Sequence, residues 1–246
     1  MTDPALSFGA AAGAYDRARP EYPREAVAWF LPDGHASGQR SRVADVGAGT
    51  GKLSVILREA GHDVVAVDPD PQMLEALSAR HPGIPTLIGT GERLPLDDAS
   101  VDAVTFGQAW HWVDPAVASP EVARVLRPGG VLGLFWNLRD ERVPWVEELS
   151  GIMHASTAEQ MIAEGGVVVT QPFGEPERFS SQWSMTFDVD GLVDLAASRS
   201  YVITETPVRR AEILDGVRAL AERVADSDGR VTMPYRTEVY RYRAVG

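Results

Sequence analysis

The chain has 246 residues and a mass of 26.6 kDa, which suits one α/β domain or one domain with an accessory lid. It contains no cysteine, and this excludes disulfides, thiolate metal sites and cysteine nucleophiles. Asp and Glu number 35 against 23 Lys and Arg, for a formal net charge of −12. An acidic surface repels phosphate backbones and anionic lipids, so we expect neither nucleic acid nor a membrane as a partner.

The sequence carries no pattern typical of a membrane span or a secretion signal. No stretch approaches the roughly 20 apolar residues that a spanning helix needs. Asp3 stands where a signal peptide has positive charge, and the Ala- and Gly-rich stretch 9–14 is short and weakly apolar. We therefore expect a cytoplasmic protein, which agrees with the lack of cysteine.

The first half of the chain alternates apolar runs typical of strands with stretches of helical spacing. Pro71 opens one expected helix, and the sequence RPGG at 127–130 is expected to stop another. The expected strands are 42–46, 63–67, 84–88, 101–106 and 131–136, and the expected helices are 53–60, 71–77 and 115–126. Strands separated by helix-length connections predict βαβ units and a parallel sheet.

The pattern becomes less regular after residue 137. Residues 207–224 predict an amphipathic helix, because Ile213, Val217, Leu220 and Val224 share one face. We also expect a helix at 144–156, a Gly- and Pro-containing connector at 165–176, and strands at 179–187 and 231–242. No internal repeat is present, so the chain reads as a single domain.

A glycine-rich stretch follows the first expected strand, where 43–52 reads VADVGAGTGK. Glycines at such a turn let a ligand approach the backbone, and open α/β sheets bind ligands at this end of their strands. The spacing differs from the GxGxxG of dinucleotide folds and from the GxxxxGK[ST] phosphate loop. Asp45 is expected to point its carboxylate at the ligand, which repels a pyrophosphate and attracts an amino or sulfonium group. A turn that only caps a helix is the alternative.

An acidic residue, Asp68, ends the second expected strand. A carboxylate at this place can accept hydrogen bonds from both hydroxyls of a ribose. Alternatively, Asp68 caps the helix that Pro71 opens. Glycine loop and acid together favour an adenosine-containing ligand without phosphates, and that ligand is S-adenosylmethionine.

These segments resemble the class I S-adenosylmethionine-dependent methyltransferases. The stretch 45–51 is similar to their first motif, and 67–74 (VDPDPQML) is similar to their second. The stretch 89–96 (GTGERLPL) resembles the segment that holds the adenine, and 101–104 with 127–132 resembles the fourth and fifth strands of the small-molecule "type 11" group.

Further segments resemble one branch of that group, the trans-aconitate methyltransferase-like proteins. They are 15–20 (YDRARP), 109–112 (AWHW) and, more weakly, 234–238 (PYRTE). The resemblance implies a Rossmann-like α/β fold, with a seven-stranded, mostly parallel sheet, helices on both faces and an antiparallel last strand. It implies one domain over 1–246, with N-terminal cap helices in 1–40, a cofactor-binding half at 41–137 and a substrate-side half at 138–246.

The resemblance also implies which residues bind S-adenosylmethionine. Asp68 is expected to face the ribose hydroxyls, Met73 the adenine, and Arg19 the cofactor's carboxylate. Thr90 stands where many relatives have Asp, and its hydroxyl can still hydrogen-bond the adenine amine. The full expected set is Tyr15, Arg19, Asp45, Gly47, Ala48, Gly49, Asp68, Pro69, Met73, Thr90, Gly91, Glu92, Gln108 and Ala109.

The acceptor side is less defined. A hydroxyl or carbon acid needs a base, for which His111 is the candidate, whereas a carboxylate needs none. The expected acceptor-binding residues are Trp110, Trp112 and Trp136, as an apolar cavity, and Arg139, Arg199 and Tyr201, as a carboxylate site. The alternatives are a packed histidine, core tryptophans and solvated arginines. No histidine has a second ligand at metal spacing, so no metal is expected.

The sequence therefore predicts methyl transfer from S-adenosylmethionine to an O, N or C atom of a small molecule. The segment after the fourth expected strand reads GQAW at 107–110 and lacks the [DNS]PP[FYW] pattern of enzymes that methylate exocyclic amines of bases. A non-catalytic S-adenosylmethionine-binding protein is the first alternative, and an NAD-type dehydrogenase is the second. The acceptor and the oligomeric state do not follow from the sequence.

Overall fold

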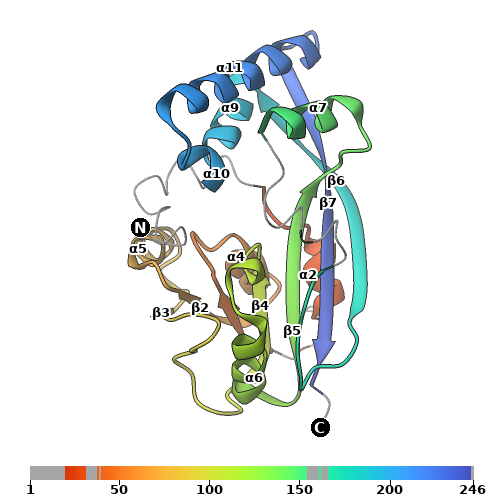
Figure 1. Cartoon of the computed structure of the whole chain (residues 1–246). Coiled ribbons are helices and arrows are strands. Elements are labelled where there is room, and N and C mark those ends of the chain that lie inside the picture. The colour runs from red at the N-terminus through yellow and green to blue at the C-terminus, as the bar shows by residue number, and fades with distance from the viewer. Residues whose placement is uncertain (1–19, 32–37, 39, 154–160, 162–165, 245–246) are drawn as a thin grey trace.

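The computed structural model describes residues 20–31, 38, 40–153, 161 and 166–244. Within them, seven strands form one sheet in the order β3-β2-β1-β4-β5-β7-β6 (Figure 1). Their bounds are β1 Arg42–Val46, β2 Asp63–Asp68, β3 Thr86–Ile88, β4 Val101–Gly107, β5 Leu126–Arg139, β6 Glu177–Asp188 and β7 Arg230–Arg243. The pairs from β3 across to β5 are parallel, and β7 runs antiparallel to both β5 and β6. The predicted mostly parallel sheet with an antiparallel last strand is confirmed.

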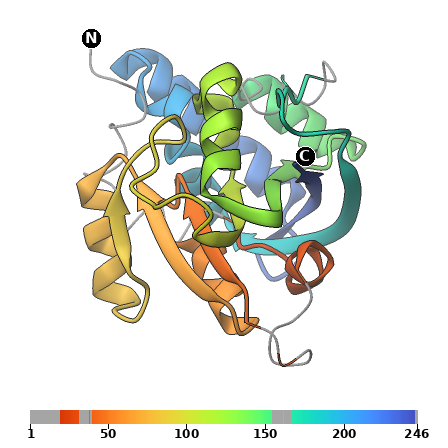
Figure 2. The same cartoon turned by 90° about the horizontal axis from the view of Figure 1, so that it is seen from below.

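Helices cover both faces of the sheet, as predicted. On one face, α2 (Arg24–Phe30) and α4 (Lys52–Glu59) pack with part of α5 (Pro71–Arg80) against apolar residues of β1, β2 and β5. On the other face lies α6 (Pro115–Val125), which packs against alternate residues of the same strands. Figure 2 shows α2 and α6 on opposite sides of the sheet. β1, β2, β4 and β5 are therefore buried on both faces over most of their length, which explains their continuous apolar runs.

Two helices begin with the same pair of residues, an aspartate followed by proline. Asp70 caps α5 by accepting a hydrogen bond from the Gln72 amide at 2.9 Å, and Asp114 caps α6 in the same way. Proline needs no partner for its nitrogen at the first helical position. Asp70, and not Asp68, is thus the N-cap of α5, which leaves the Asp68 carboxylate for another role.

The second half of the chain contributes a group of helices that we call the helical lid. It consists of α7 (Pro144–Met153), α9 (Val189–Ala197), α10 (Ser200–Ile203) and α11 (Pro207–Val224). The lid has its own apolar core, to which Leu149, Leu195, Val217 and Met233 contribute. It lies beyond the carboxyl ends of the parallel strands (Figure 1). The predicted helix at 207–224 is confirmed, and Ile213, Val217 and Leu220 are buried.

Three strands extend further than their apolar runs indicated. β5 and β7 pair from Val131 to Arg139, and β6 pairs with β7 over its whole length. The segment 127–130, expected only to stop a helix, lies inside β5 as a bulge between the pairs Val101↔Leu126 and Ala103↔Val131. Gly129 has a φ of +82° there, a conformation that glycine adopts readily. In the described part of the chain, no helix has the length and apolar character to cross a membrane.

Candidate functional site

The glycine loop connects β1 to α4 at the carboxyl end of the sheet. Gly47, Gly49 and Gly51 have φ values of +66°, +55° and +91°. The amides of Gly47 and Ala48 both donate to the Val67 carbonyl of β2, at 2.8 and 3.1 Å. A Cβ on Gly47 would lie 2.4 Å from the Cβ of Ala109, so this position admits only glycine. The loop is thus held tightly between the ends of β2 and β4.

Asp68 lies at the end of β2, beside the loop. Its Oδ2 accepts a hydrogen bond from the Gly49 amide and its Oδ1 accepts one from the Asp70 amide, both at 2.8 Å. Burial raises the pKa of Asp68, and these two amides act in the opposite direction. The carboxyl group therefore both fixes the loop and borders a cavity, where its remaining lone pairs can accept further hydrogen bonds.

Asp45 has a different environment from the one expected. Its carboxylate accepts hydrogen bonds from Ser54 Oγ at 2.5 Å and from Thr105 Oγ1 at 2.9 Å, and the residue is almost fully buried. Burial raises the pKa of Asp45 to about 6, although the two hydroxyls lower it. Each Asp45 oxygen thus already accepts one hydrogen bond from a neighbouring side chain, and the residue borders the smaller of the two cavities next to the glycine loop.

Two cavities border the glycine loop, and the larger of these two, of about 320 Å³, opens between the loop, the end of β2 and the loop that follows β3. The expected residues that line it are Gly47, Gly49, Asp68, Pro69, Met73, Thr90, Gly91, Glu92, Gln108 and Ala109. Trp112, expected on the acceptor side, lines this cavity too, as do Val46, Phe106, Gly107 and Val113, which the sequence did not indicate. No lysine or arginine is among the described residues that line it, which suits a nucleoside and disfavours a phosphate group.

The turn after β3 forms one wall of this cavity. Thr90 and Arg93 exchange backbone hydrogen bonds, so that Gly91 and Glu92 form the tip of the turn. A Cβ on Gly91 would lie 2.8 Å from a methyl group of Val113, which lines the same cavity. Glu92 Oε1 accepts a hydrogen bond from the Asp114 amide at 2.9 Å. The wall therefore rests on the residues just before α6.

The smaller cavity, of about 70 Å³, lies on the other side of the glycine loop. Ala48, Gly47 and Gly49 line it, together with Gln108 and Arg199, which comes from the helical lid. The sequence indicated no role for the other members: Pro20, Tyr22, Thr50, Lys52, Leu53, Gly107 and Asn137. Thr50, Lys52, Leu53 and Gly107 are sequence neighbours of expected residues, whereas Pro20, Tyr22 and Asn137 reach the cavity through packing between distant segments.

Gln108 separates the two cavities and has an unusual backbone. Its φ is +58°, which is uncommon outside glycine, and its amide donates to the Phe135 carbonyl at 2.9 Å. Its Nε2 donates to the Asn137 carbonyl at 2.8 Å, while the Asn137 side chain bonds Glu21 and Thr237. Gln108 is therefore held by β5 in a strained conformation of the kind that clusters at functional sites.

Several residues expected on the acceptor side lie elsewhere. Trp110 and Trp136 are fully buried in the core beside α6, and line neither cavity. The Trp110 indole donates to the Val168 carbonyl at 2.9 Å. The expectation of a tryptophan-lined acceptor cavity is wrong for these two, because their side chains point into the sheet–helix interface.

The remaining expected residues have mixed placements. His111 lies in the short 3₁₀ helix η3 (Trp110–Trp112) and lines neither cavity, with its ring 4.8 Å from that of Trp112. Arg139 is buried against Met153 of the lid, and Tyr201 packs on the lid core, and neither lines a cavity. Tyr15 and Arg19 lie outside the described residues.

The strand order, the glycine loop and an acidic residue at the end of β2 define an α/β protein that binds a nucleoside-containing ligand at the carboxyl end of its sheet. Residues 44–134 match the family described as "Methyltransferase domain". An uncharacterized methyltransferase of Mycobacterium tuberculosis is 50% identical over 242 residues, covering 97% of this chain and 96% of the relative, and one of Mycobacterium bovis is equally similar.

A solved structure from Anaeromyxobacter dehalogenans that carries a methyltransferase name shares the fold, with a TM-score of 0.66 and 24% identity, over 92% of this chain and 97% of the other. The chain belongs to the class I S-adenosylmethionine-dependent methyltransferases. Its cofactor is S-adenosylmethionine, and the larger cavity fits the adenosine part, since it offers a carboxylate and lacks basic side chains. The NAD-type dehydrogenase considered above is excluded.

Proposed function

We propose that the chain methylates a small carboxylate-bearing acceptor, which enters the smaller cavity from the side of the helical lid. The observation that carries this proposal is the position of Arg199. Its side chain is only 7% exposed, it lines the smaller cavity, and its Nε has no hydrogen-bond partner among the described residues. A buried guanidinium without an ion pair is costly, and a ligand carboxylate would compensate that cost.

The two cavities share residues in a way that supports this arrangement. Gly47, Gly49, Gly107 and Gln108 line both, so a ligand in one cavity lies next to a ligand in the other. In this proposal the adenosine part contacts Asp68 and the turn at Thr90–Glu92, and the methionine part follows the glycine loop. The acceptor then lies between Gln108 and Arg199. Arg139 and Tyr201 act only by packing the lid that presents Arg199.

S-Adenosylmethionine supplies a methyl group on a sulfonium, which is activated for in-line displacement. A carboxylate oxygen forms the new bond to the methyl carbon as the methyl–sulfur bond breaks, which leaves a methyl ester and a neutral thioether without proton transfer. The protein's contribution is to orient the acceptor through Arg199, to hold the glycine loop through Asp68, and to exclude water beneath the lid. His111 lies outside both cavities, and this reaction needs no base.

The proposal is tested with a panel of small carboxylic acids, phenols and amines of similar size, with product detection by mass spectrometry. We expect acids to be methylated, and Arg199→Gln to lower kcat/KM for them by about 10- to 100-fold, since a charge-assisted hydrogen bond is lost. The matched control is Arg210→Gln, which removes an exposed arginine from the same lid. Preferred methylation of amines, or an Arg199 variant equal to the control, would contradict the proposal. Tight cofactor binding without turnover of any acceptor would favour a non-catalytic protein.

A further inference from the structure

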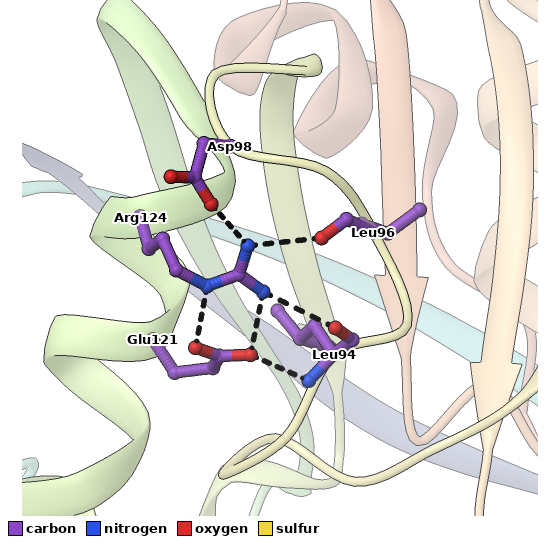
Figure 3. Close-up of polar contacts among 5 residues, drawn as sticks. All are labelled: Leu94, Leu96, Asp98, Glu121 and Arg124. Atoms are coloured by element: carbon purple, nitrogen blue, oxygen red, sulfur yellow. Dashed lines mark hydrogen bonds and ion pairs between the residues drawn. The ribbon is translucent and has the colours of Figure 1, made fainter.

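A single arginine of α6, Arg124, binds the segment that follows the turn Thr90–Arg93, which forms one wall of the larger cavity (Figure 3). Arg124 makes a two-pronged contact with Glu121, in which Nε and Nη2 each lie 2.8 Å from a carboxylate oxygen. Its Nη1 donates to the Leu96 carbonyl at 3.0 Å and to Asp98 Oδ1 at 2.6 Å. Nη2 also donates to the Leu94 carbonyl at 3.2 Å. All three nitrogens of the guanidinium are engaged, in the fixed geometry that arginine provides.

Glu121 completes this contact from the same helix. Its Oε1 accepts a hydrogen bond from the Leu94 amide at 2.8 Å, so both backbone polar groups of Leu94 are bound to α6. The Leu94 side chain is 4% exposed and belongs to the core between α6 and the sheet. The hydrogen bond from Arg124 lowers the pKa of Glu121 below its usual range. Leu94 is therefore fixed by its backbone and by its side chain.

Leu94 directly follows the turn that forms the wall of the larger cavity. The other end of this turn is held as well, because the Gly89 amide donates to the Asp68 carbonyl at 3.2 Å. Gly91 and Glu92, at the tip of the turn, line the cavity, whereas Arg124 and Glu121 do not. The tip is thus held at three places: by β2 at Gly89, by the Asp114 amide at Glu92, and by α6 at Leu94.

We propose that Arg124 is a positioning residue for cofactor recognition, which holds the Gly91–Glu92 tip at the distance that adenine requires. An exposed arginine pair usually contributes little to folding. Here, however, the arginine binds two backbone carbonyls of one short segment, so its loss frees that segment rather than a single side chain. This role is independent of the identity of the methyl acceptor.

The test compares Arg124→Ala, Arg124→Lys and Arg127→Ala by calorimetric titration with S-adenosylhomocysteine and with its hypoxanthine analogue. Arg127 is the matched control. It forms an exposed ion pair with Asp102 near the same end of α6, and its side chain does not bind the turn Thr90–Arg93. Titrations are made at a temperature at which circular dichroism shows every variant folded.

We expect Arg124→Ala to raise the Kd of S-adenosylhomocysteine by about tenfold. The Gly91–Glu92 tip would still line the cavity but would be displaced from the position that favours adenine binding. We expect the preference for adenine over hypoxanthine to fall together with the affinity. Arg124→Lys should retain part of the affinity and part of the preference, and Arg127→Ala should change neither quantity. Should Arg124→Ala fail to fold, Arg124→Lys still shows the partial loss. The proposal is overturned if the adenine preference is unchanged in the folded Arg124 variants, since a purely stabilising contact would lower Tm alone.

Discussion

The Gly49 amide donates a hydrogen bond of 2.8 Å to Asp68 Oδ2, and this contact ties the glycine loop of β1 to the end of β2. The same carboxylate borders the cavity that fits adenosine. One side chain therefore both holds the loop and lines the cavity. Because both Asp68 oxygens also accept backbone amides, the group is held in one orientation before the ligand arrives.

Replacement of Asp68 by alanine should weaken cofactor binding strongly. The expected loss is about 1–3 kcal/mol, because a buried hydrogen-bond partner is removed and the Gly49 amide is left without an acceptor. Calorimetric titration with S-adenosylmethionine measures this loss. Asp63→Ala is the control, since Asp63 is an exposed residue at the opposite end of the same strand. Equal affinities of the two folded variants would show that Asp68 does not contact the ligand.

The raised pKa of Asp45 predicts a pH-dependent stability. In the folded state this pKa is about 6 against a model-compound value of 3.8, so between these values the folded protein binds more protons than the unfolded chain. The contribution of Asp45 to the free energy of unfolding therefore falls as the pH rises from about 4 to about 6. Above pH 6 the total loss is about 3 kcal/mol.

Asp45→Asn removes this titration. Urea unfolding of wild type and variant at a series of pH values measures their free energies of unfolding. The value for the variant should rise relative to that of the wild type from pH 4 to pH 6, and the difference between the two should be constant above pH 7. A difference that does not change with pH would show that Asp45 titrates normally in the folded protein.

Gly47→Ala should impair both stability and cofactor binding. The φ of +66° strains any residue with a Cβ, and the added atom would overlap Ala109. Gly129→Ala is a close control, because Gly129 has a φ of +82° but no heavy atom within 4 Å of a built Cβ. We expect about 1–2 kcal/mol of destabilisation for Gly129→Ala and more for Gly47→Ala. Similar unfolding midpoints and unchanged affinity in Gly47→Ala would argue against the tight packing of the loop.

His111→Ala should leave the methylation of a carboxylate acceptor nearly unchanged. The ring lies outside both cavities, and a carboxylate is already a nucleophile at neutral pH. Steady-state kinetics with the best acid from the acceptor panel provide the measurement. A large fall in kcat would instead identify His111 as a base that reaches the site by a movement of η3.

Several residues that line the larger cavity could be placed there from the sequence, because they lie within two positions of strand ends. Asp68 ends β2, Gly47 and Ala109 closely follow β1 and β4, and the carboxyl ends of parallel strands meet at one edge. The orientation of Asp45 was less accessible, since its partner Thr105 lies on a different strand, β4. Residue spacing alone does not show in which direction a side chain at the end of a strand points.

The acceptor side was harder for the same physical reason. Trp136 is one residue from Asn137, yet alternation along β5 places the tryptophan in the core beside α6 and the asparagine at the smaller cavity. Arg199 reaches that cavity only because the helical lid folds over the end of the sheet. Its neighbour in space, Gln108, is distant in the sequence, so long-range packing decides the contact.

We propose that the larger cavity binds the adenosine of S-adenosylmethionine against Asp68. Calorimetric titration of the full chain with S-adenosylmethionine, S-adenosylhomocysteine and NAD tests it most directly. We predict one site per chain with micromolar affinity for the first two ligands, and no heat of binding for NAD, whose pyrophosphate meets no basic side chain there. Absence of binding by both S-adenosyl compounds, or comparable binding of NAD, would contradict the account.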